Sequence, residues 1–337
     1  RGPAIGGLRM APDVSTRECF RLARAMTFKN AAADLPHGGG KSVLYADPAM
    51  PAADKEQLLR AFACALEEVE QYVFGPDMGT DEQCMGWVRD EIGRAVGLPR
   101  EVGGIPLDEI GATGWGLLHA IREACRFQGR ELPGSQVAVQ GFGAVGSHAA
   151  RFLAQAGAVV VAVADIRGTV ACADGLDLAQ LLAIRGEGGS VVDYPAGPGV
   201  THGPNEAIID VSCDIWIPAA RPDVIREDNV DRLRTAMVVC GANIPLTRGA
   251  ERRLHERGVL CIPDFIANAG GVICAAMEYQ GAGEAAAMDI VAEKLSYNTR
   301  RVLDIVRCDG CLPREAAEDM AQRRVRRAMS LKRWNLF

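Results

Sequence analysis

Residues 135–165 read SQVAVQGFGAVGSHAARFLAQAGAVVVAVAD, and this stretch decides the fold. The apolar run Val137–Val139 predicts a short buried strand, and residues 147–156 continue as a helix. A second apolar run, Ala158–Ala164, predicts another strand, which ends at Asp165. A strand, a helix and a second strand in this order indicate a parallel β-α-β unit, and with it an α/β fold.

Glycines occupy the turn between the first strand and the helix. Gly141, Gly143 and Gly146 form the pattern G-x-G-x-x-G, which is weak by itself but here has the strand, helix and terminal acid that dinucleotide binding requires. The first glycine permits a tight turn, the second lets the backbone reach a pyrophosphate, and the third allows close helix–strand packing. The alternative is a glycine turn without a ligand. We expect the whole turn to bind a dinucleotide at the helix N-terminus, including Phe142, Ala144 and Val145.

The acid after the second strand bears on which dinucleotide is bound. Asp165 would accept hydrogen bonds from the adenosine ribose hydroxyls, and its charge would repel a 2′-phosphate. Arg167, two residues later, could instead accommodate that phosphate. We therefore predict NAD as the cofactor, and NADP stays open because of Arg167.

The later chain continues the alternation of strands and helices. Three further strands are expected at residues 214–218, 237–240 and 259–263, each followed by turn residues. Ligands of open parallel sheets bind at the carboxyl ends of strands, so the residues that follow these strands should line a cofactor cleft. These residues are Ala219, Ala220, Asn243 and Asn268. For Asn268, an Asx-turn or a helix cap is the alternative.

Three other segments of the second half have expected structures. Residues 186–205 are rich in glycine and proline and predict a surface loop. A long helix is expected over residues 272–306, broken at 281–284. An arginine-rich amphipathic helix is expected over residues 313–332.

Two lysines stand out in the segment AMTFKNAAADLPHGGGKSVLYADP, residues 25–48. Lys29 ends an apolar-periodic helix, and Lys41 lies between three glycines and the expected strand 42–45. Pro36 and the glycines predict a tight irregular turn. Two solvated lysines are the simpler interpretation, but a lysine half-buried beside a strand favours its neutral form and can act as a base.

The rest of the first 110 residues mixes strands and helices. The segment GPAIGGLRM, residues 2–10, predicts a glycine turn that leads into a strand, and Ser15 is expected to cap the following helix. A second helix is expected over residues 51–71. Asp77 follows a short apolar run, and it either caps a helix at residues 81–96 or projects from a strand end into a cleft.

Length, composition and charge exclude several classes of function. A chain of 337 residues is long for one domain and sufficient for two. The net charge of −6 argues against nucleic acid and an anionic membrane surface as partners. No apolar run reaches the roughly 18 residues of a membrane span. The 11 scattered cysteines predict a reducing cytoplasm.

Metal-binding patterns are weak in this sequence. Cys308 and Cys311 form a single C-x-x-C pair, and the five histidines make no recognised ligand pattern, so we predict no metal. The chain begins at Arg1 in a segment that resembles the interior of a domain, and we expect an upstream segment to be missing or processed away.

Eight short motifs occur along nearly the whole chain: GPAIGGLRM, MTFKNAAADLPHGGGK, GPDMGT, GATG, GFGAVG, IPAA, GANIPLT and IPDFIANAGGVI. In this order they resemble the glutamate/leucine/phenylalanine/valine dehydrogenase family. The resemblance implies reversible oxidative deamination, in which an L-amino acid, water and NAD(P)⁺ give a 2-oxo acid, ammonium and NAD(P)H. It also implies a homo-oligomer.

The resemblance implies roles for individual residues. Lys29 would hold the substrate α-carboxylate, and Lys41 would activate water for attack on the imine. Asp77 would move protons on and off the amino group, which the Pro76 carbonyl helps to hold. Gly6, Gly7 and Asn268 would position the substrate, and Thr113 and Asn243 would contact the cofactor. A carboxylate clamp, a desolvated lysine and a carboxylic acid are what iminium hydrolysis needs.

Two positions bear on the substrate side chain. Glutamate enzymes of the family carry a lysine and a serine where this sequence has Ile5 and Ala275, so the pocket resembles that of the leucine, valine and phenylalanine members. A carboxylate buried there without a partner would cost several kcal/mol. The segments GPDMGTDEQCMGW and NTRRVL look closer to the glutamate branch, and Arg300 or Arg301 could supply a replacement anchor.

We therefore predict two α/β domains. Residues 1–110, with about 301–337, would form the substrate-binding, catalytic and oligomerisation domain, and residues 111–300 a doubly wound NAD-binding domain. The expected function is NAD-dependent deamination of an apolar L-amino acid. A glutamate or other polar amino-acid dehydrogenase is one alternative, and a catalytically silent regulatory oligomer that binds NAD is another.

Overall fold

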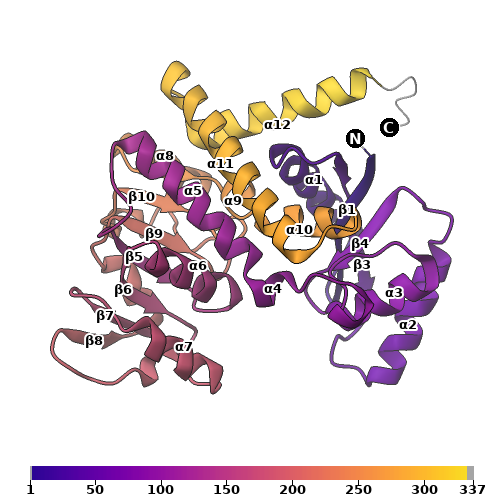
Figure 1. Cartoon of the computed structure of the whole chain (residues 1–337), viewed down its shortest axis with the longest axis horizontal. Coiled ribbons are helices and arrows are strands. Elements are labelled where there is room, and N and C mark those ends of the chain that lie inside the picture. The colour runs from indigo at the N-terminus through magenta and orange to yellow at the C-terminus, as the bar shows by residue number, and fades with distance from the viewer. Residues whose placement is uncertain (1, 332–337) are drawn as a thin grey trace. The chain divides into compact units, whose positions relative to one another are not determined.

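The structure of the protein is a computed structural model that describes residues 2–331 (Figure 1). Arg1 and residues 332–337, which fall within the predicted first domain, lie outside the described residues. The rest of the chain forms two compact units. Unit 1 contains residues 2–110, 271–291 and 318–331, and unit 2 contains residues 111–270 and 292–317.

In the second half of the chain, the boundaries of these compact units differ from the predicted domain boundaries. Residues 271–291 belong to unit 1 rather than to the dinucleotide-binding domain, because the buried Glu278 carboxylate accepts hydrogen bonds from the Leu98 and Ile105 amides. Residues 301–317 belong to unit 2, where Arg314 pairs with two carboxylates. The first division between the compact units falls between residues 110 and 111.

The sheet of unit 1 is built around one long strand, β1 (Gly2–Ala11). Three shorter strands pair with it, all in parallel: β2 (His37–Gly39), β3 (Ser42–Tyr45) and β4 (Tyr72–Pro76). The glycine turns predicted here are wrong. The segment GPAIGGLRM contains the predicted strand, but the strand runs through its glycines, and Gly38 and Gly39 lie in β2.

Close backbone approach explains why glycines occupy these strands. A Cβ at Gly6 would overlap the Gly40 carbonyl, and a Cβ at Gly39 would overlap the backbone at Thr27. The glycines therefore let β1, β2 and the neighbouring helix pack backbone against backbone.

The helices of unit 1 begin and end at recognisable signals. Ser15 caps α1 by accepting a hydrogen bond from the Glu18 amide, as predicted. The second helix ends at Ala65 instead of residue 71, and the third ends at Ile92 because Gly93 closes it in the left-handed conformation. The helices are α1 (Thr16–Ala32), α2 (Ala52–Ala65), α3 (Glu82–Ile92) and α4 (Leu107–Ile110).

Unit 2 contains a mixed seven-stranded sheet in the order β11-β10-β9-β5-β6-β7-β8. The first five are parallel, β7 pairs antiparallel with β6, and β8 pairs antiparallel with β7. Because β8 lies at residues 200–203, the predicted loop at residues 186–205 is in part a strand. The strands are β5 (Gln136–Gln140), β6 (Val159–Ala164), β7 (Thr169–Cys172), β8 (Val200–Gly203), β9 (Ile215–Pro218), β10 (Met237–Val239) and β11 (Leu260–Ile262).

Helices within residues 112–267 pack on this sheet, and further helices follow toward the C-terminus (Figure 1). A Cβ at Gly114 would lie 2.7 Å from the Ala149 amide, so α5 and α6 are in close contact. The predicted break at residues 281–284 is confirmed, because α10 ends at Tyr279 and α11 begins at Glu284. The helices are α5 (Ala112–Gln128), α6 (Ala144–Gln155), α7 (Leu178–Gly186), α8 (Arg248–Glu256), α9 (Asp264–Ala267), α10 (Gly270–Tyr279), α11 (Glu284–Asp309) and α12 (Pro313–Ser330).

Three properties hold across residues 2–331. All 11 cysteines, which lie within this range, are free thiols. The helices of this range are too short or too polar to cross a membrane. Its histidine, cysteine, aspartate and glutamate side chains make no group of three that could hold a metal ion.

Candidate active site

The pairing of strands in unit 1 brings Lys41 and Asp77 together. Leu8 of β1 lies between Ser42 of β3 on one side and Pro76 of β4 on the other. Lys41 directly precedes Ser42, and Asp77 directly follows Pro76. The Lys41 Nζ and Asp77 Oδ2 atoms lie 2.5 Å apart.

Gly7 leaves the space in which this pair meets. A Cβ at Gly7 would lie 2.9 Å from Lys41 Nζ, 2.8 Å from the Asp77 Cβ and 2.9 Å from the Pro76 carbonyl oxygen. Any other residue at this position would push the two side chains apart. The structure therefore brings four of the predicted site residues together: Gly7, Lys41, Pro76 and Asp77.

Burial determines the charge properties of Lys41. Its side chain is 7% exposed, and this burial lowers the pKa of its ammonium group below the ordinary lysine value. The Asp77 carboxylate opposes the shift without cancelling it, and the positive charge of Arg9 adds to it. A lysine in this environment can lose its proton more readily than a solvated lysine.

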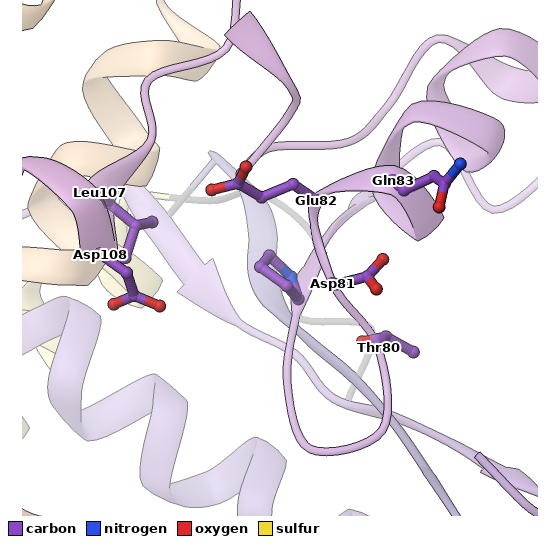
Figure 2. A pocket seen from close by; sticks show the side chains of 8 residues that line it. Thr80, Asp81, Glu82, Gln83, Leu107 and Asp108 are labelled. Atoms are coloured by element: carbon purple, nitrogen blue, oxygen red, sulfur yellow. The ribbon is translucent and has the colours of Figure 1, made fainter. Parts of the chain in front are cut away.

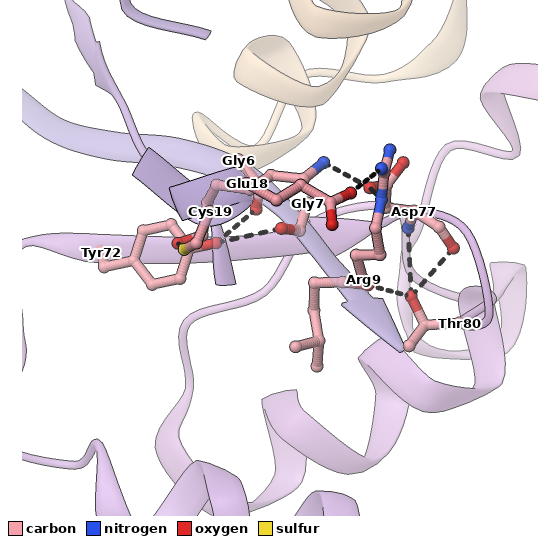
Figure 3. A network of polar contacts seen from close by, with 10 residues as sticks. Gly6, Gly7, Arg9, Glu18, Cys19, Tyr72, Asp77 and Thr80 are labelled. Carbon is pink, nitrogen blue, oxygen red and sulfur yellow. Dashed lines mark hydrogen bonds and ion pairs between the residues drawn. The ribbon is translucent and has the colours of Figure 1, made fainter. Parts of the chain in front are cut away.

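Arg9 is a site residue that the sequence interpretation missed (Figure 3). Its Nε donates to Asp77 Oδ2 at 3.0 Å, and its guanidinium also pairs with Glu18 Oε1 at 2.6 Å. Burial by itself would raise the pKa of Asp77, but Lys41 and Arg9 outweigh it and keep that pKa below its usual value. Asp77 is therefore ionised. The strand period of two, which places Arg9 on the same face as Gly7, could have indicated this contact.

Asp77 does not cap the helix that follows β4, which was one of its two predicted roles. Asp81 is the residue that caps α3, and its side chain accepts a hydrogen bond from the Cys84 amide at 2.9 Å. The Thr80 hydroxyl accepts from the Asp77 amide at 3.1 Å and donates to the Leu8 carbonyl at 2.7 Å (Figure 3). These bonds fasten the loop to β1 and keep Asp77 facing its two cations.

A hydrogen-bonded asparagine fixes the end of the helix that carries Lys29. Lys29 lies half-buried in the last turn of α1. The side-chain amide of the next residue, Asn30, donates to the Ile5 carbonyl at 3.2 Å and to the Gly38 carbonyl at 2.7 Å. The Tyr72 hydroxyl donates to the Gly6 carbonyl at 3.0 Å (Figure 3). The backbone around the Lys41–Asp77 pair is thus held from both sides of β1.

A cavity of about 450 Å³ opens on unit 1 beside the loop that follows β4 (Figure 2). Asp81, Glu82 and Asp108 line it, and no lysine or arginine is among its lining residues. Burial and the neighbouring acids, Asp108 first among them, raise the pKa of Glu82. An acidic cavity does not suit the carboxylate of an amino acid, so we do not place the substrate there.

The positions expected to contact the substrate side chain are apolar and buried. Ile5 on β1 is 3% exposed, and Ala275 on α10 is 8% exposed. Arg300, a candidate replacement anchor, belongs to unit 2 and forms two hydrogen bonds with Glu123, at 3.1 and 3.0 Å.

The glycine turn of unit 2 has the geometry that the fingerprint predicts. Gly141 has a φ of +98°, and a Cβ there would lie 2.8 Å from the backbone of Ala219 and Ala220. A Cβ at Gly146 would overlap the Gly141 carbonyl, so that glycine permits the close packing of helix and turn. Gly143 has no atom within 4 Å of a Cβ position, which leaves its backbone open at the N-terminus of α6. The turn suits a pyrophosphate.

Asp165 is more heavily hydrogen-bonded than the sequence suggests. Its Oδ1 accepts from the Arg167 and Gly168 amides, and its Oδ2 accepts from the Ser190 hydroxyl and the Val191 amide. A carboxylate has about four acceptor sites, so a ribose hydroxyl could bond here only in place of one of these donors. These hydrogen bonds outweigh burial and lower the pKa of Asp165, which keeps its negative charge.

Two asparagines of unit 2 meet at the carboxyl ends of β10 and β11. The Asn268 side-chain amide donates to Asn243 Oδ1 at 2.9 Å and to the Gly241 carbonyl at 3.3 Å. Asn268 also forms the C-cap of α9, where its backbone amide donates to the Asp264 carbonyl, so the predicted helix cap is present. Thr113 lies in the first turn of α5, where a Cβ at Gly270 would lie 3.0 Å from the Thr113 Cα.

Comparisons with known proteins agree with this architecture. The family model described as Glutamate/Leucine/Phenylalanine/Valine dehydrogenase matches residues 103–333, and the model of its dimerisation domain matches residues 1–94. The NADP(+)-dependent glutamate dehydrogenase of Pyrobaculum calidifontis is 40% identical over 296 residues, which cover 82% of this chain and 69% of that protein.

Solved structures of two dehydrogenases are also similar. The hetero-hexameric glutamate dehydrogenase of Thermus thermophilus has a TM-score of 0.86 and 28% identity, over 98% of this chain and 82% of that chain. The L-tryptophan dehydrogenase of Nostoc punctiforme has a TM-score of 0.75 and 25% identity, over 97% of this chain and 89% of that chain. With a buried lysine–aspartate pair in one unit and a dinucleotide fold in the other, the chain belongs to the glutamate/leucine/phenylalanine/valine dehydrogenase family of amino-acid dehydrogenases.

Proposed function

We propose that this protein catalyses the reversible NAD-dependent oxidative deamination of an apolar L-amino acid. The products are the 2-oxo acid, ammonium and NADH. The observation that carries the proposal is the buried Lys41–Asp77 ion pair over Gly7, with Arg9 as a second cation on Asp77. A buried lysine of lowered pKa beside an ionised carboxylate supplies both a base and a proton acceptor for iminium hydrolysis.

Each residue has a step in this mechanism. Lys29 pairs with the substrate α-carboxylate, and the Pro76 carbonyl accepts a hydrogen bond from the amino group. Asp77 takes a proton from that amino group. A nicotinamide coenzyme, held by the glycine turn at residues 141–146, would supply the acceptor for the hydride of the α-carbon. Neutral Lys41 would remove a proton from water as it attacks the iminium carbon, and Asp77 would return a proton to the nitrogen. The C–N bond would then break as the new hydroxyl group loses its proton to the leaving ammonia, which gives the 2-oxo acid and ammonium.

The proposed substrate class follows from the buried surfaces of Ile5 and Ala275. An apolar side chain would bury against them favourably, whereas a second carboxylate would need a cation that these residues do not supply. The name of the tryptophan dehydrogenase neighbour supports an apolar substrate. Glutamate is the second candidate substrate, because the Pyrobaculum and Thermus relatives are both named glutamate dehydrogenases.

The proposal of NAD rests on charges near the end of β6. Asp165 is ionised and would repel a 2′-phosphate, and Arg167 is paired with Asp193 at 3.1 Å. The pair is exposed, so a 2′-phosphate could still compete for Arg167. One relative is named NADP(+)-dependent, which makes NADP the competing coenzyme. The match to a dimerisation domain supports a homo-oligomer.

Replacing the two lysines should affect different kinetic parameters. We expect Lys41→Ala to lower kcat by about 10²–10⁴-fold while NADH still binds, because it removes the base. We expect Lys29→Ala chiefly to raise KM, because its ion pair exists in ground and transition states alike. Lys55→Ala on α2, a lysine that bonds to the Pro48 carbonyl, is the control. A near-normal kcat for Lys41→Ala would show that the base lies elsewhere.

Arg9 should set the pH at which Lys41 becomes active. The positive charge of Arg9 lowers the pKa of Lys41, so its removal in Arg9→Gln raises that pKa. The acid limb of the kcat/KM profile for deamination should therefore move to higher pH. The profile of Arg17→Gln, which changes an exposed arginine of α1, should match the wild type. A shift to lower pH in Arg9→Gln would contradict the assignment of Lys41 as the base.

A spectrophotometric screen of the standard L-amino acids tests the substrate pocket. Leucine, valine, isoleucine, methionine or phenylalanine should be preferred, with modest discrimination of ~1–3 kcal/mol per methylene among them. Combining Ile5→Lys with Ala275→Ser should raise the ratio of glutamate to leucine turnover, and the single substitutions show which position matters. If the wild type prefers glutamate, the apolar pocket is refuted, and Arg300→Ala and Arg301→Ala then test the replacement anchors.

The same screen, run with both coenzymes, tests the role of Asp165. We expect NAD⁺ to be used at least about tenfold more efficiently than NADP⁺, which corresponds to ~1.4 kcal/mol of charge repulsion. Asp165→Ser should reduce this ratio, whereas Asp174→Ser, at an exposed acid of unit 2, should not. The ratio of NAD⁺ to NADP⁺ efficiency does not depend on what fraction of the protein is folded. This matters because Asp165→Ser also removes the acceptor of the Ser190 hydroxyl and could lower stability. Equal efficiency in the wild type would show that Arg167 dominates.

A further inference from the structure

A second buried charge cluster lies within unit 2 and has no role in the mechanism above. Arg314, at the start of α12, donates from Nε to Glu251 Oε2 at 2.5 Å and from its terminal nitrogen to Asp264 Oδ1 at 3.0 Å. The three side chains are 14%, 3% and 9% exposed, respectively. Arg314 is thus one cation that is hydrogen-bonded to two buried carboxylates.

The second oxygen of Asp264 holds a strained turn. Asp264 Oδ2 accepts a hydrogen bond from the Ile244 amide at 2.8 Å. Ile244 has a φ of +50°, a conformation that is unfavourable for a β-branched residue. Such a conformation persists only where surrounding contacts impose it, and the bond to Asp264 is one of those contacts.

The strained turn adjoins one asparagine of the proposed cofactor site and, through it, contacts the other. Asn243 directly precedes Ile244, and its Oδ1 accepts from the Asn268 side chain at 2.9 Å. The Asp264 carbonyl accepts a hydrogen bond from the Asn268 amide at 2.8 Å. Asp264 therefore helps to position both asparagines. Its carboxylate bonds to the Ile244 amide, next to Asn243, and its backbone carbonyl bonds to the Asn268 amide.

We propose that Arg314 is a positioning residue that fixes the Asn243–Asn268 pair for the nicotinamide end of the coenzyme, acting through Asp264. This role rests on the proposed function. Without Arg314, Asp264 would be a buried carboxylate beside a second one, Glu251, and the two would repel each other. Asp264 would then move away from Glu251, and its bond to the Ile244 amide would weaken. The hydrogen bonds described for this cluster join Arg314, Glu251, Asp264 and Ile244, so we expect the turn at residues 141–146 to be unaffected.

Comparing the affinities for NADH and for a fragment without the nicotinamide distinguishes a positioning role of Arg314 from a general loss of stability. We would measure the Kd of NADH and of ADP-ribose, which lacks the nicotinamide, by calorimetry on the full chain. The wild type should bind NADH more tightly than ADP-ribose. In Arg314→Met this advantage should fall by about tenfold, the value of a charged hydrogen bond, while the Kd of ADP-ribose stays constant. Arg314→Lys, which keeps the charge, should restore part of the advantage.

Two matched variants complete the design. Arg323→Met changes an arginine of the same helix that is 76% exposed, and it should leave both affinities unchanged. Asp264→Asn keeps the size of the side chain and should reduce the advantage of NADH, which tests the proposal independently if Arg314→Met does not fold. If the coenzyme screen selects NADP, NADPH and the 2′-phosphorylated ADP-ribose replace the NAD pair.

The outcomes distinguish this proposal from the proposed function. An unchanged advantage of NADH in Arg314→Met and Asp264→Asn, or a parallel loss of both affinities with melting temperature, would overturn the positioning role. A wild type that binds NADH but deaminates no amino acid would refute the proposed function, and the affinity ratios would still test Arg314. A wild type that binds neither nucleotide would overturn both.

Discussion

The parallel pairing of β1 with β3 and β4 is the constraint on which the candidate catalytic centre depends. Because Leu8 has Ser42 and Pro76 as its two neighbours, the residues next to them, Lys41 and Asp77, meet over one point of β1. That point must be a glycine, since a Cβ at Gly7 would lie within 3 Å of both side chains. Strand register therefore sets the distance between two charged side chains, Lys41 and Asp77, that lie 36 residues apart in sequence.

Burial then gives these two groups their chemical properties. A lysine taken out of water loses part of its preference for the charged form, whereas an aspartate with two cations as partners keeps its charge. Arg9 acts on both, because it stabilises the Asp77 carboxylate and repels the Lys41 ammonium. The same arginine thus favours an ionised acid beside a lysine that deprotonates easily, which is the combination that the proposed mechanism requires.

Local patterns predicted the fold class, most strands and the glycine turn, because these depend on neighbouring residues. The predictions failed where glycines serve packing: residues 37–39 form a strand under α1 rather than a turn, because a long-range backbone contact excludes side chains there. Arg9 and Arg314 were also missed, since their partners lie 68 and 50 residues away in sequence. Asp165 was recognised as a strand-end acid, but its four protein donors come in part from residues 190–191, which no local pattern connects to it.

The choice between an apolar substrate and glutamate depends on where a second carboxylate would find a cation. Ile5 and Ala275 cannot provide one, and their burial excludes water as a substitute. Arg300 is already bonded to Glu123, a carboxylate that is 4% exposed, so recruiting it for a substrate would weaken its bonds to a buried charge. Arg126 also pairs with Glu123 and would limit that loss. Recruiting Arg300 would therefore cost part of its interaction energy with Glu123, although Arg126 would remain as a partner. An apolar substrate side chain requires no such rearrangement of buried charges. The interaction energies thus favour the proposed apolar substrate.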